Sequence, residues 1–416
     1  MVFVQYSSGS TATPRGFAIS HGALTANQAM MRTALGHDAT WRSVSWLPPH
    51  HDMGLVGGIL QPLAEGALGV LLPTLRVVQK PIRWLRAIDR WKGSVSTGPN
   101  FMFEGCVSRV PAEERAGLDL ASWRVACCGA EPIDAGVMAA FVAAYAPHGF
   151  APGTLYPCYG LAEATLFMTG GAAGDGMRAL TVDREALGRG AAAETSHGLS
   201  LVACGRPWAG GRIAIVDDGL RPVPDGTVGA IWIGGPSLTS GIWSPDGPPR
   251  PIARPIADGS RTPFIRSGDL GFLHGGDLVP VGRCDDVVII RGVNHHPDDI
   301  ERTALAAAAA AAPVGCAVFA AEAGDQAGLA VAVEIGRSAA RGIDGEALAR
   351  GIADRIAAEH GMRPVVAMIL REGGLPRTTS GKIQRHRCRE GLADASWPKP
   401  AFVAAVAGQP LPPPAA

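Results

Sequence analysis

The sequence carries no excess of charge of either sign: its 416 residues include 37 Lys plus Arg and 37 Asp plus Glu. This balance gives no electrostatic reason to expect nucleic acid or an anionic membrane as a partner. No uncharged apolar run reaches the length that spans a membrane, because the alanine-rich run 304–312 is too short. The first residues show no basic stretch followed by an apolar one, so no signal peptide is visible. We therefore expect a cytoplasmic protein that is not embedded in a membrane.

Disulfide and metal signatures are also missing. The eight cysteines contain no C-x-x-C pair, and we interpret them as reduced, buried thiols of a cytosolic protein. His50, His51 and Asp52 are adjacent, but no third ligand stands at a recognisable spacing, so metal ligation by the imidazoles is not expected. Hydrophobic residues make up 47% and charged residues 18% of the chain, which indicates a packed globular protein of two or three domains.

The first part of the chain, residues 1–170, alternates short apolar runs with longer amphipathic ones. We expect strands at 43–47, 67–72, 94–96, 123–128 and 154–159, and helices at 22–35, 53–64, 81–91, 100–109 and 135–146. Strands that alternate with helices predict parallel pairing and a doubly wound α/β layer, in which ligands bind beyond the carboxyl ends of the strands.

The pattern changes three times after this part. Residues 171–203 are rich in Gly and Ala with little periodicity and suggest a mobile or inserted segment. Residues 204–283 alternate short strands with Gly, Pro and Asp turns, which predicts a small β-rich subdomain. Residues 284–400 predict a compact α+β domain, and 401–416 form a Pro-rich tail that we expect to be disordered.

A loop of small hydroxyl residues follows the first apolar run. Ser7, Ser8, Ser10 and Thr11 surround Gly9, and Thr13 and Arg15 come directly after them. Backbone N–H groups and hydroxyls in such a loop can donate to phosphate oxygens, and Arg15 adds a positive charge. The loop does not match the Walker pattern, and an ordinary Ser/Thr-rich turn is the competing interpretation.

Further along, several loops carry residues suited to a nucleotide. Gly129 to Glu131 follow one strand, where small residues would let a flat base pass the backbone. Tyr159 offers an aromatic face for stacking, and Glu163 offers a carboxylate suited to Mg²⁺. Asp269, in a tight Gly loop, could accept hydrogen bonds from two ribose hydroxyls. Taken singly, Asp269 could form an Asx turn and Glu163 could complement a helix dipole.

The order of these pieces carries more information than any one of them. The hydroxyl loop, His50-His51-Asp52, Gly129 to Pro132, Tyr159 to Thr165, Ser267 to Gly271, Gly282 to Asp286 and Pro376 to Lys382 together resemble the adenylate-forming superfamily of acyl-CoA synthetases, peptide-synthetase adenylation domains and luciferases. Within it, the stretches 44–55, 98–101, 156–164 and 289–301 resemble the fatty acyl-AMP ligase branch. The resemblance covers residues 1 to about 395, and 171–203 lie where that branch carries its insertion.

The resemblance implies a role for each candidate residue. Ser7, Ser8, Gly9, Ser10, Thr11, Thr13 and Arg15 would grip the β- and γ-phosphates of ATP; Gly129, Ala130, Glu131, Tyr159 and Gly160 would line the adenine; Glu163 would hold Mg²⁺; and Asp269 and Arg283 would bind the ribose hydroxyls. Asp285 would be the hinge of a small mobile C-terminal domain, Lys382 would reach the carboxylate and α-phosphate, and His51 would lie near the acyl carboxylate.

The implied activity is ATP-dependent conversion of a fatty acid to an acyl-adenylate, with release of pyrophosphate and transfer of the acyl group to the phosphopantetheine arm of an acyl carrier protein. The chain departs from the family pattern at Ala12, where Gly is usual, and at Arg15, where Lys is common. Family members also carry a substantial subdomain before the phosphate loop, whereas this sequence begins almost on it. A long-chain fatty acyl-CoA ligase and a truncated, non-catalytic nucleotide- or partner-binding remnant are the alternatives.

Overall fold

The computed structural model describes residues 1–6, 15–38, 40–290, 293–323, 326–337, 339–340, 342–378, 381–394 and 400–405. The chain divides into two compact units, of which the first extends to Val281 and the second starts at Gly282. Within the described ranges, no helix is long and apolar enough to cross a membrane.

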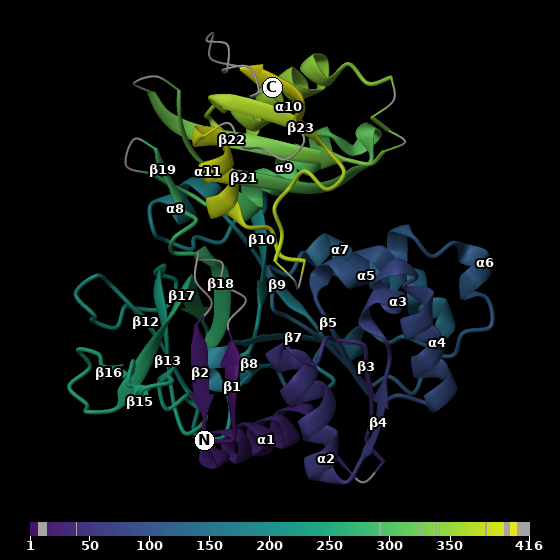
Figure 1. Ribbon diagram of the computed structural model, residues 1–416, viewed down its shortest axis with the longest axis vertical. Coiled ribbons are helices and arrows are strands. Elements are labelled where there is room, and N and C mark those ends of the chain that lie inside the picture. Colours follow the sequence, from purple (N-terminus) through teal and green to yellow (C-terminus); the bar gives the residue numbers. More distant parts are fainter. Residues whose placement is uncertain are drawn as a thin grey trace. The chain divides into compact units, whose positions relative to one another are not determined.

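The first unit contains a seven-stranded sheet with the strand order β11-β8-β7-β6-β5-β3-β4 (Figure 1). The five strands from β4 to β7 run parallel, whereas β8 and β11 are antiparallel to their neighbours. The parallel core of this sheet confirms the predicted doubly wound layer. The strands are β3 (Arg42–Ser45), β4 (Leu68–Leu71), β5 (Val95–Gly98), β6 (Val125–Cys128), β7 (Leu155–Gly160), β8 (Phe167–Gly170) and β11 (Arg206–Pro207).

Helices cover both faces of this sheet. They are α1 (His21–Leu35), α2 (Gln61–Glu65), α3 (Thr74–Gln79), α4 (Ile82–Trp91), α5 (Asn100–Ser108), α6 (Ala112–Arg115) and α7 (Ala135–Tyr145). In β6, Ala126 and Cys128 belong to the core beneath α4, α5 and α7, whereas Val125 and Cys127 belong to the core beneath α1. A strand buried on both faces needs apolar residues at every position, which explains the continuous run in β6.

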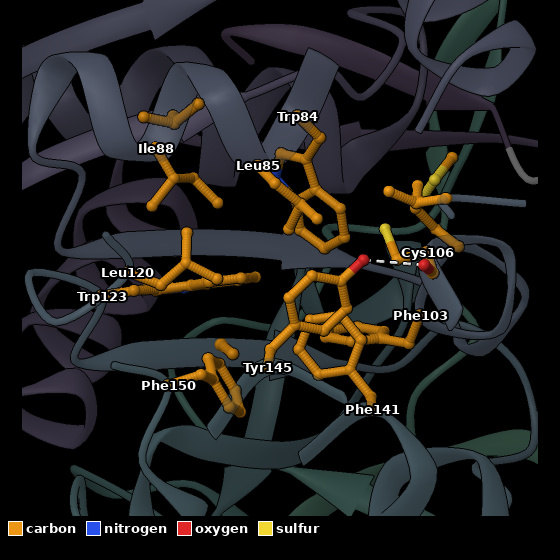
Figure 2. Close-up of a cluster of buried hydrophobic side chains, with 14 of the residues drawn as sticks. Trp84, Leu85, Ile88, Phe103, Cys106, Leu120, Trp123, Phe141, Tyr145 and Phe150 are labelled. Carbon is orange, nitrogen blue, oxygen red and sulfur yellow. Dashed lines mark hydrogen bonds between the residues drawn. The ribbon is translucent and has the colours of Figure 1, made fainter. Parts of the chain in front are cut away.

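The larger core lies between the sheet and α4, α5 and α7 (Figure 2). Trp84, Phe103, Trp123 and Phe141 are nearly or fully buried, and their rings meet edge to face, with centroids 5.0–6.2 Å apart in the Trp84–Phe103, Trp84–Trp123, Phe103–Phe141 and Trp123–Phe141 pairs. The buried hydroxyl of Tyr145 donates to the carbonyl oxygen of Cys106 at 2.7 Å, so α7 is also fixed to α5 by a hydrogen bond.

One expected helix has a different geometry. Residues 53–64 form a π-helix over Met53–Leu60, followed by α2, rather than one α-helix. Gly54 packs so closely that a Cβ there would lie 2.1 Å from the Pro48 carbonyl oxygen, and one at Gly58 would lie 2.5 Å from the Ser45 hydroxyl. Glycine at both positions therefore lets this helix approach the end of β3. Wider turns of this kind occur frequently at functional sites.

The β-rich part of the first unit has the predicted character. A five-stranded sheet contains β12 (Arg212–Val216), β13 (Gly229–Gly234), β16 (Arg254–Pro255), β17 (Pro263–His274) and β18 (Asp277–Arg283). A separate sheet joins β1 (Phe3–Tyr6), β2 (Gly16–Ile19), β14 (Ile242–Ser244) and β15 (Gly247–Arg250). The segment 171–203, expected to be mobile or inserted, contains a hairpin of β9 (Arg178–Val182) and β10 (Leu199–Ala203) with α8 (Arg184–Gly188) between the two strands. Val182, Leu187 and Leu199 are buried, and this small core gives the segment its order.

The second unit is an α+β fold around the sheet β21-β22-β23-β24. Helices α9 and α10 cover one face, and α11 covers the other. Residues 401–405, expected to belong to a disordered tail, form part of β24, which pairs antiparallel with β23; the rest of that tail lies outside the described residues. The elements are β19 (Val288–Ile290), β20 (Val293–His295), α9 (Pro297–Ala307), β21 (Pro313–Ala323), β22 (Gln326–Ile335), α10 (Gly345–His360), β23 (Val366–Arg371), α11 (Arg385–Ala393) and β24 (Pro400–Ala405).

Candidate active site

The carboxyl ends of four parallel strands define the candidate site. His51 follows β3, Asn100 follows β5 and Gly129 to Glu131 follow β6. Tyr159 is the penultimate residue of β7, and Glu163 follows that strand. Parallel neighbours end at the same edge of a sheet, so these residues gather there, as in other open α/β sheets that bind ligands.

The loop after β6 is fixed to the loop after β5. The carboxylate of Glu131 accepts a hydrogen bond from the backbone N–H of Phe101 at 2.7 Å, and Asn100 Oδ1 accepts one from the N–H of Asp134 at 3.0 Å. Glu131 therefore caps α5, a role that its sequence position did not reveal. Ala130 holds a left-handed φ of 70°, which costs an L-residue roughly 1–2 kcal/mol. Strain of this kind clusters at ligand sites.

Tyr159 and Asp269 meet although 110 residues separate them. The Tyr159 hydroxyl donates to Asp269 Oδ2 at 2.6 Å, which joins the end of β7 to β17 of the neighbouring sheet. Asp269 lies on a bulge: residues 267–269 stand opposite the single residue Ile231, since Arg266 pairs with Trp232 and Leu270 with Ala230. Two predicted nucleotide-binding residues are thus in direct contact.

The bulge that carries Asp269 has its own supports. Gly268 takes φ 85°, a conformation that glycine adopts without a steric penalty. The Ser267 hydroxyl donates to the Ile231 carbonyl at 2.9 Å and accepts from the Asp269 N–H at 3.0 Å. Burial, together with the negative charge of Asp269, raises the pKa of Tyr159 well above its usual value. The phenol therefore keeps its proton and acts as a permanent donor to Asp269.

Glu163 stands in a short 3₁₀ turn, Ala162–Ala164, that several buried groups hold in place. Asn27 of α1, fully buried, donates to the carbonyl oxygens of Ala164 and Phe167 at 3.1 and 2.8 Å and accepts from the Phe167 N–H at 3.2 Å. On the other side, the Thr239 N–H donates to the Glu163 carbonyl at 2.8 Å. The carboxylate of Glu163 is thus presented by a turn that cannot easily shift.

Thr165, which follows the turn 162–164, has a strained backbone, as Ala130 does. It holds φ 74° and ψ −54° while its hydroxyl donates to the Ser237 carbonyl at 2.7 Å. Sequence reasoning missed Asn27, Ser237 and Thr239. One signal was present for Asn27: it lies on the buried stripe of α1 with Ala23, Met30 and Ala34, and a buried amide needs hydrogen-bond partners.

His51 pairs with its own neighbour. Its Nδ1 lies 2.6 Å from Asp52 Oδ1, and the same carboxylate accepts from the Met53 N–H at the start of the π-helix. The Gln5 side chain donates to the His50 carbonyl at 3.3 Å, which ties this turn to β1. The imidazole is oriented by Asp52, and its proximity to an acyl carboxylate stays a prediction.

The remaining predicted residues fall into two groups. Ser7, Ser8, Gly9, Ser10, Thr11 and Thr13 lie outside the described residues, and Arg15 stands exposed just before β2. Arg283, Asp285 and Lys382 belong to the second unit, so their approach to the residues of the first unit stays a prediction. Lys382 lies on a tight hairpin that is described below.

A cavity of about 510 Å³ lies elsewhere in the first unit, lined by Tyr156, Trp208 and the charged residues Asp175, Arg178, Arg206 and Asp277. Asp277 is almost fully buried and forms ion pairs with both Arg178 and Arg206, and Asp175 adds a second carboxylate to the lining. This cavity therefore offers no net positive charge for a triphosphate.

The donors around Glu163 can be compared with the needs of Mg²⁺. No group of three or more His, Cys, Asp or Glu that could hold a metal is found among the residues the structure describes. Mg²⁺ is usually bound by one or two carboxylates, water and substrate phosphates rather than by an all-protein cage. A single carboxylate on an anchored turn, such as that of Glu163, fits this manner of binding.

Comparison with known proteins agrees with the geometry. The family described as AMP-binding enzyme matches residues 1–243. The medium-chain-fatty-acid–[acyl-carrier-protein] ligase TtuA of Teredinibacter turnerae is 39% identical over 94% of this chain, and the chain spans 63% of the length of that relative.

Two solved structures are similar. One, from a study of fatty acyl-adenylate ligases of E. coli and L. pneumophila, has a TM-score of 0.81 at 32% identity and covers 94% of this chain and 70% of its own. The other is the fatty acyl-adenylate ligase from L. pneumophila in complex with acyl adenylate and pyrophosphate. It has a TM-score of 0.67 at 35% identity, and the match covers 98% of this chain and 71% of that protein. The chain therefore belongs to the AMP-binding enzyme family, and within it to the fatty acyl-AMP ligase branch of the adenylate-forming fold.

Proposed function

We propose that this chain carries the adenylating machinery that activates a fatty acid with ATP, releases pyrophosphate and passes the acyl group to the phosphopantetheine arm of an acyl carrier protein, in the biosynthesis of a lipid, polyketide or lipopeptide. The observation that carries the proposal is the hydrogen bond between Tyr159 and Asp269, which unites an aromatic ring and a carboxylate suited to adenosine at the carboxyl edge of the sheet. The relative TtuA, named for fatty acids and acyl carrier protein, supports the substrate and partner. All eight cysteines are free, which supports a cytoplasmic location.

The first step needs positioning and charge more than proton transfer. A fatty-acid carboxylate is already ionised, so one of its oxygens attacks the α-phosphorus directly while the bond to the β-phosphate oxygen breaks and pyrophosphate leaves. Negative charge concentrates on the phosphoryl oxygens, and a lysine such as Lys382 stabilises it without giving up a proton. Mg²⁺, held by Glu163, would neutralise phosphate charge when bound.

The nucleoside end is held by the rigid groups of the first unit. Tyr159, kept neutral by its raised pKa, orients the Asp269 carboxylate, which can accept from the two ribose hydroxyls. The strained Ala130 and the close approach of Gly129 to β7, where a Cβ would lie 2.7 Å from the Cys158 carbonyl oxygen, leave the edge flat enough for a base.

In the second step the thiol of the carrier arm attacks the acyl carbon, the thiol proton is lost, and AMP leaves.

The proposal is tested by pyrophosphate release from the purified chain with ATP, Mg²⁺ and a series of fatty acids. Lys382→Ala is expected to lower kcat about 100-fold or more, since a cation that acts on developing charge is lost. Lys80→Ala is the matched control, because Lys80 is an exposed lysine of the first unit that forms a surface ion pair with Glu114 at 3.1 Å. This substitution should leave the rate unchanged.

The acceptor is identified by adding either CoA or a carrier protein with its phosphopantetheine arm. Thioester formation with the carrier protein supports the proposal, and thioester formation with CoA alone would replace it with an acyl-CoA ligase. A folded chain that binds ATP but releases no pyrophosphate with any fatty acid would show a non-catalytic binding module.

A further inference from the structure

Lys382 lies on a tight hairpin in the second unit. The Thr378 N–H donates to the Lys382 carbonyl at 2.8 Å, and the Lys382 N–H donates back to the Thr378 hydroxyl at 3.1 Å. The Gln384 N–H closes the hairpin on the Pro376 carbonyl at 2.9 Å, and Arg377 bridges to Ile383. This local geometry fixes the shape of the hairpin but not its place on the unit.

Arg377 anchors the first arm of the hairpin. Its Nη2 lies 3.0 Å from Glu334 Oε2 and 3.3 Å from the Val314 carbonyl oxygen, and its Nη1 donates to the Gly381 carbonyl at 3.3 Å. The Glu334 side chain is only 4% exposed, so this ion pair links the hairpin to the interior of the sheet at β22.

The second arm of the hairpin leads into α11, whose first residue, Arg385, is the centre of a larger network. Its guanidinium binds Glu301 with two hydrogen bonds, from Nε at 2.8 Å and from Nη2 at 2.7 Å. Nη1 donates to Asp286 at 2.8 Å, and Nη2 also donates to Asp298 at 2.5 Å. One cation thus holds three carboxylates, of which Glu301 also accepts from the Val318 N–H at 2.8 Å.

The electrostatics of this network depend on the guanidinium. The Arg385 side chain is 15% exposed. Burial disfavours its charge, but Asp298, Glu301 and Asp286 outweigh that effect and raise the pKa of Arg385. Burial also raises the pKa of Glu301, and the charge and hydrogen bonds of Arg385 partly offset this increase. A lysine could not replace this residue, because only the planar guanidinium offers five donors in a fixed fork.

We propose that Arg385 is a positioning residue that fixes the Lys382 hairpin and the chain directly after Asp285 to one rigid body; this inference rests on the proposed function. Asp286 follows the predicted hinge Asp285, and Arg385 ties it to Asp298 and Glu301 of α9. Lys382 precedes Arg385 by three residues, a span of at most about 10 Å. The rigid body therefore starts immediately after the hinge and carries Lys382 with it.

The test compares Arg385→Gln and Arg385→Lys with the control Arg363→Gln in the full chain. Arg363 is exposed and pairs with Asp354 on α10, so its loss removes an arginine ion pair that is remote from the hairpin. Hydrogen exchange should become at least tenfold faster at 376–384 and at 286–290 in both Arg385 variants, and it should be unchanged in α10. Arg363→Gln should alter neither segment.

Kinetics separate a positioning role from a merely structural one. Arg385→Gln should lower kcat for pyrophosphate release at least 30-fold and change KM for ATP less than threefold, and Arg385→Lys should not restore the rate. Lys382→Ala with Arg385→Gln should be no slower than Lys382→Ala alone, because Arg385 acts through Lys382. A further tenfold loss in the double variant, or unchanged exchange at 376–384 in Arg385→Gln, would overturn the inference.

If an Arg385 variant does not fold, Asp286→Asn takes its place, because this substitution leaves the hydrogen bonds between Arg385 and Glu301 intact. Asp286→Asn should accelerate hydrogen exchange at 286–290. Unchanged exchange at 286–290 would contradict the proposal that Arg385 holds this part of the chain. The exchange measurements also hold if the wild-type chain releases no pyrophosphate. In that case the proposed function fails, whereas faster exchange at 376–384 in Arg385→Gln would still show that the clamp exists.

Discussion

The hydroxyl of Tyr159 and the carboxylate of Asp269 form the smallest functional unit of the candidate site. Their 2.6 Å hydrogen bond combines a donor that stays protonated with an acceptor that is presented by a bulge. The sequence assigned these two residues to the adenine and the ribose separately. The structure adds that Tyr159 orients Asp269, so a substitution of Tyr159 should also weaken binding of the ribose.

Tyr159→Phe keeps the ring and removes only the hydroxyl. We expect the KM for ATP to rise about tenfold, because a hydrogen bond to a charged group contributes about 1.5–3 kcal/mol and the Asp269 carboxylate loses its orientation. The fatty-acid KM should change little.

Tyr156→Phe is the control for this change, because its hydroxyl donates to the Gly171 carbonyl at 2.8 Å, on the same strand but away from Asp269. Steady-state kinetics that show equal effects of both substitutions on the KM for ATP would contradict the assignment of Tyr159.

At the scale of elements, the turn that carries Glu163 is clamped between α1 and the loop 237–241. Asn27 holds one side with three hydrogen bonds, and Thr239 holds the other. Thr239 also donates to the Ala18 carbonyl at 2.9 Å, so the same loop fixes β2, which follows Arg15. The carboxylate predicted for Mg²⁺ and the strand after the predicted phosphate loop thus share one support.

Asn27→Ala should reduce the free energy of unfolding by about 3 kcal/mol, because it leaves three buried backbone groups without partners. It should also raise the Mg²⁺ concentration needed for half-maximal activity, since the turn of Glu163 loosens. Denaturant unfolding and a Mg²⁺ titration measure the two effects.

Thr25→Ala serves as the comparison in the same helix, because Thr25 is exposed and donates only to the His21 carbonyl four residues earlier. A loss of stability from Asn27→Ala no greater than that from Thr25→Ala would show that the clamp is not needed.

On the scale of the whole molecule, each unit has its own hydrophobic core. Phe141 is fully buried among the aromatic rings of the first unit (Figure 2), and Ile352 of α10 is buried in the core of the second. A unit with its own core can respond to a cavity by itself.

Phe141→Ala should lower the free energy of unfolding by about 3–5 kcal/mol, and Ile352→Ala should lower it by about 2–5 kcal/mol. Each substitution removes buried apolar surface and leaves a cavity. Hydrogen exchange should accelerate throughout the unit that contains the change and remain as in the wild type in the other unit. Faster exchange in both units from either substitution would indicate a single cooperative body.

Local pattern was enough to predict most of the architecture. The Ser20 cap, whose side chain accepts from the Ala23 N–H, marks the start of α1 close to its expected place, and the helix expected at 135–146 is present as α7 over Ala135–Tyr145. Local pattern was not enough at 53–60, where close packing of Gly54 and Gly58 produces a π-helix, or at 171–203, where a small core orders a segment without periodicity. In both cases the deciding contacts come from residues that are not neighbours in sequence.

Residue type and short spacing were enough to predict the alternation of strands and helices, the family resemblance and the residues that carry charge and aromatic rings. Folding brings Tyr159 to Asp269, places Asn27 against the turn of Glu163, and gathers Asp286, Asp298 and Glu301 around Arg385. These contacts join residues 84 to 140 positions apart in the sequence. A hydrogen bond across such a separation forms when sheets and helices pack, and no local pattern records it.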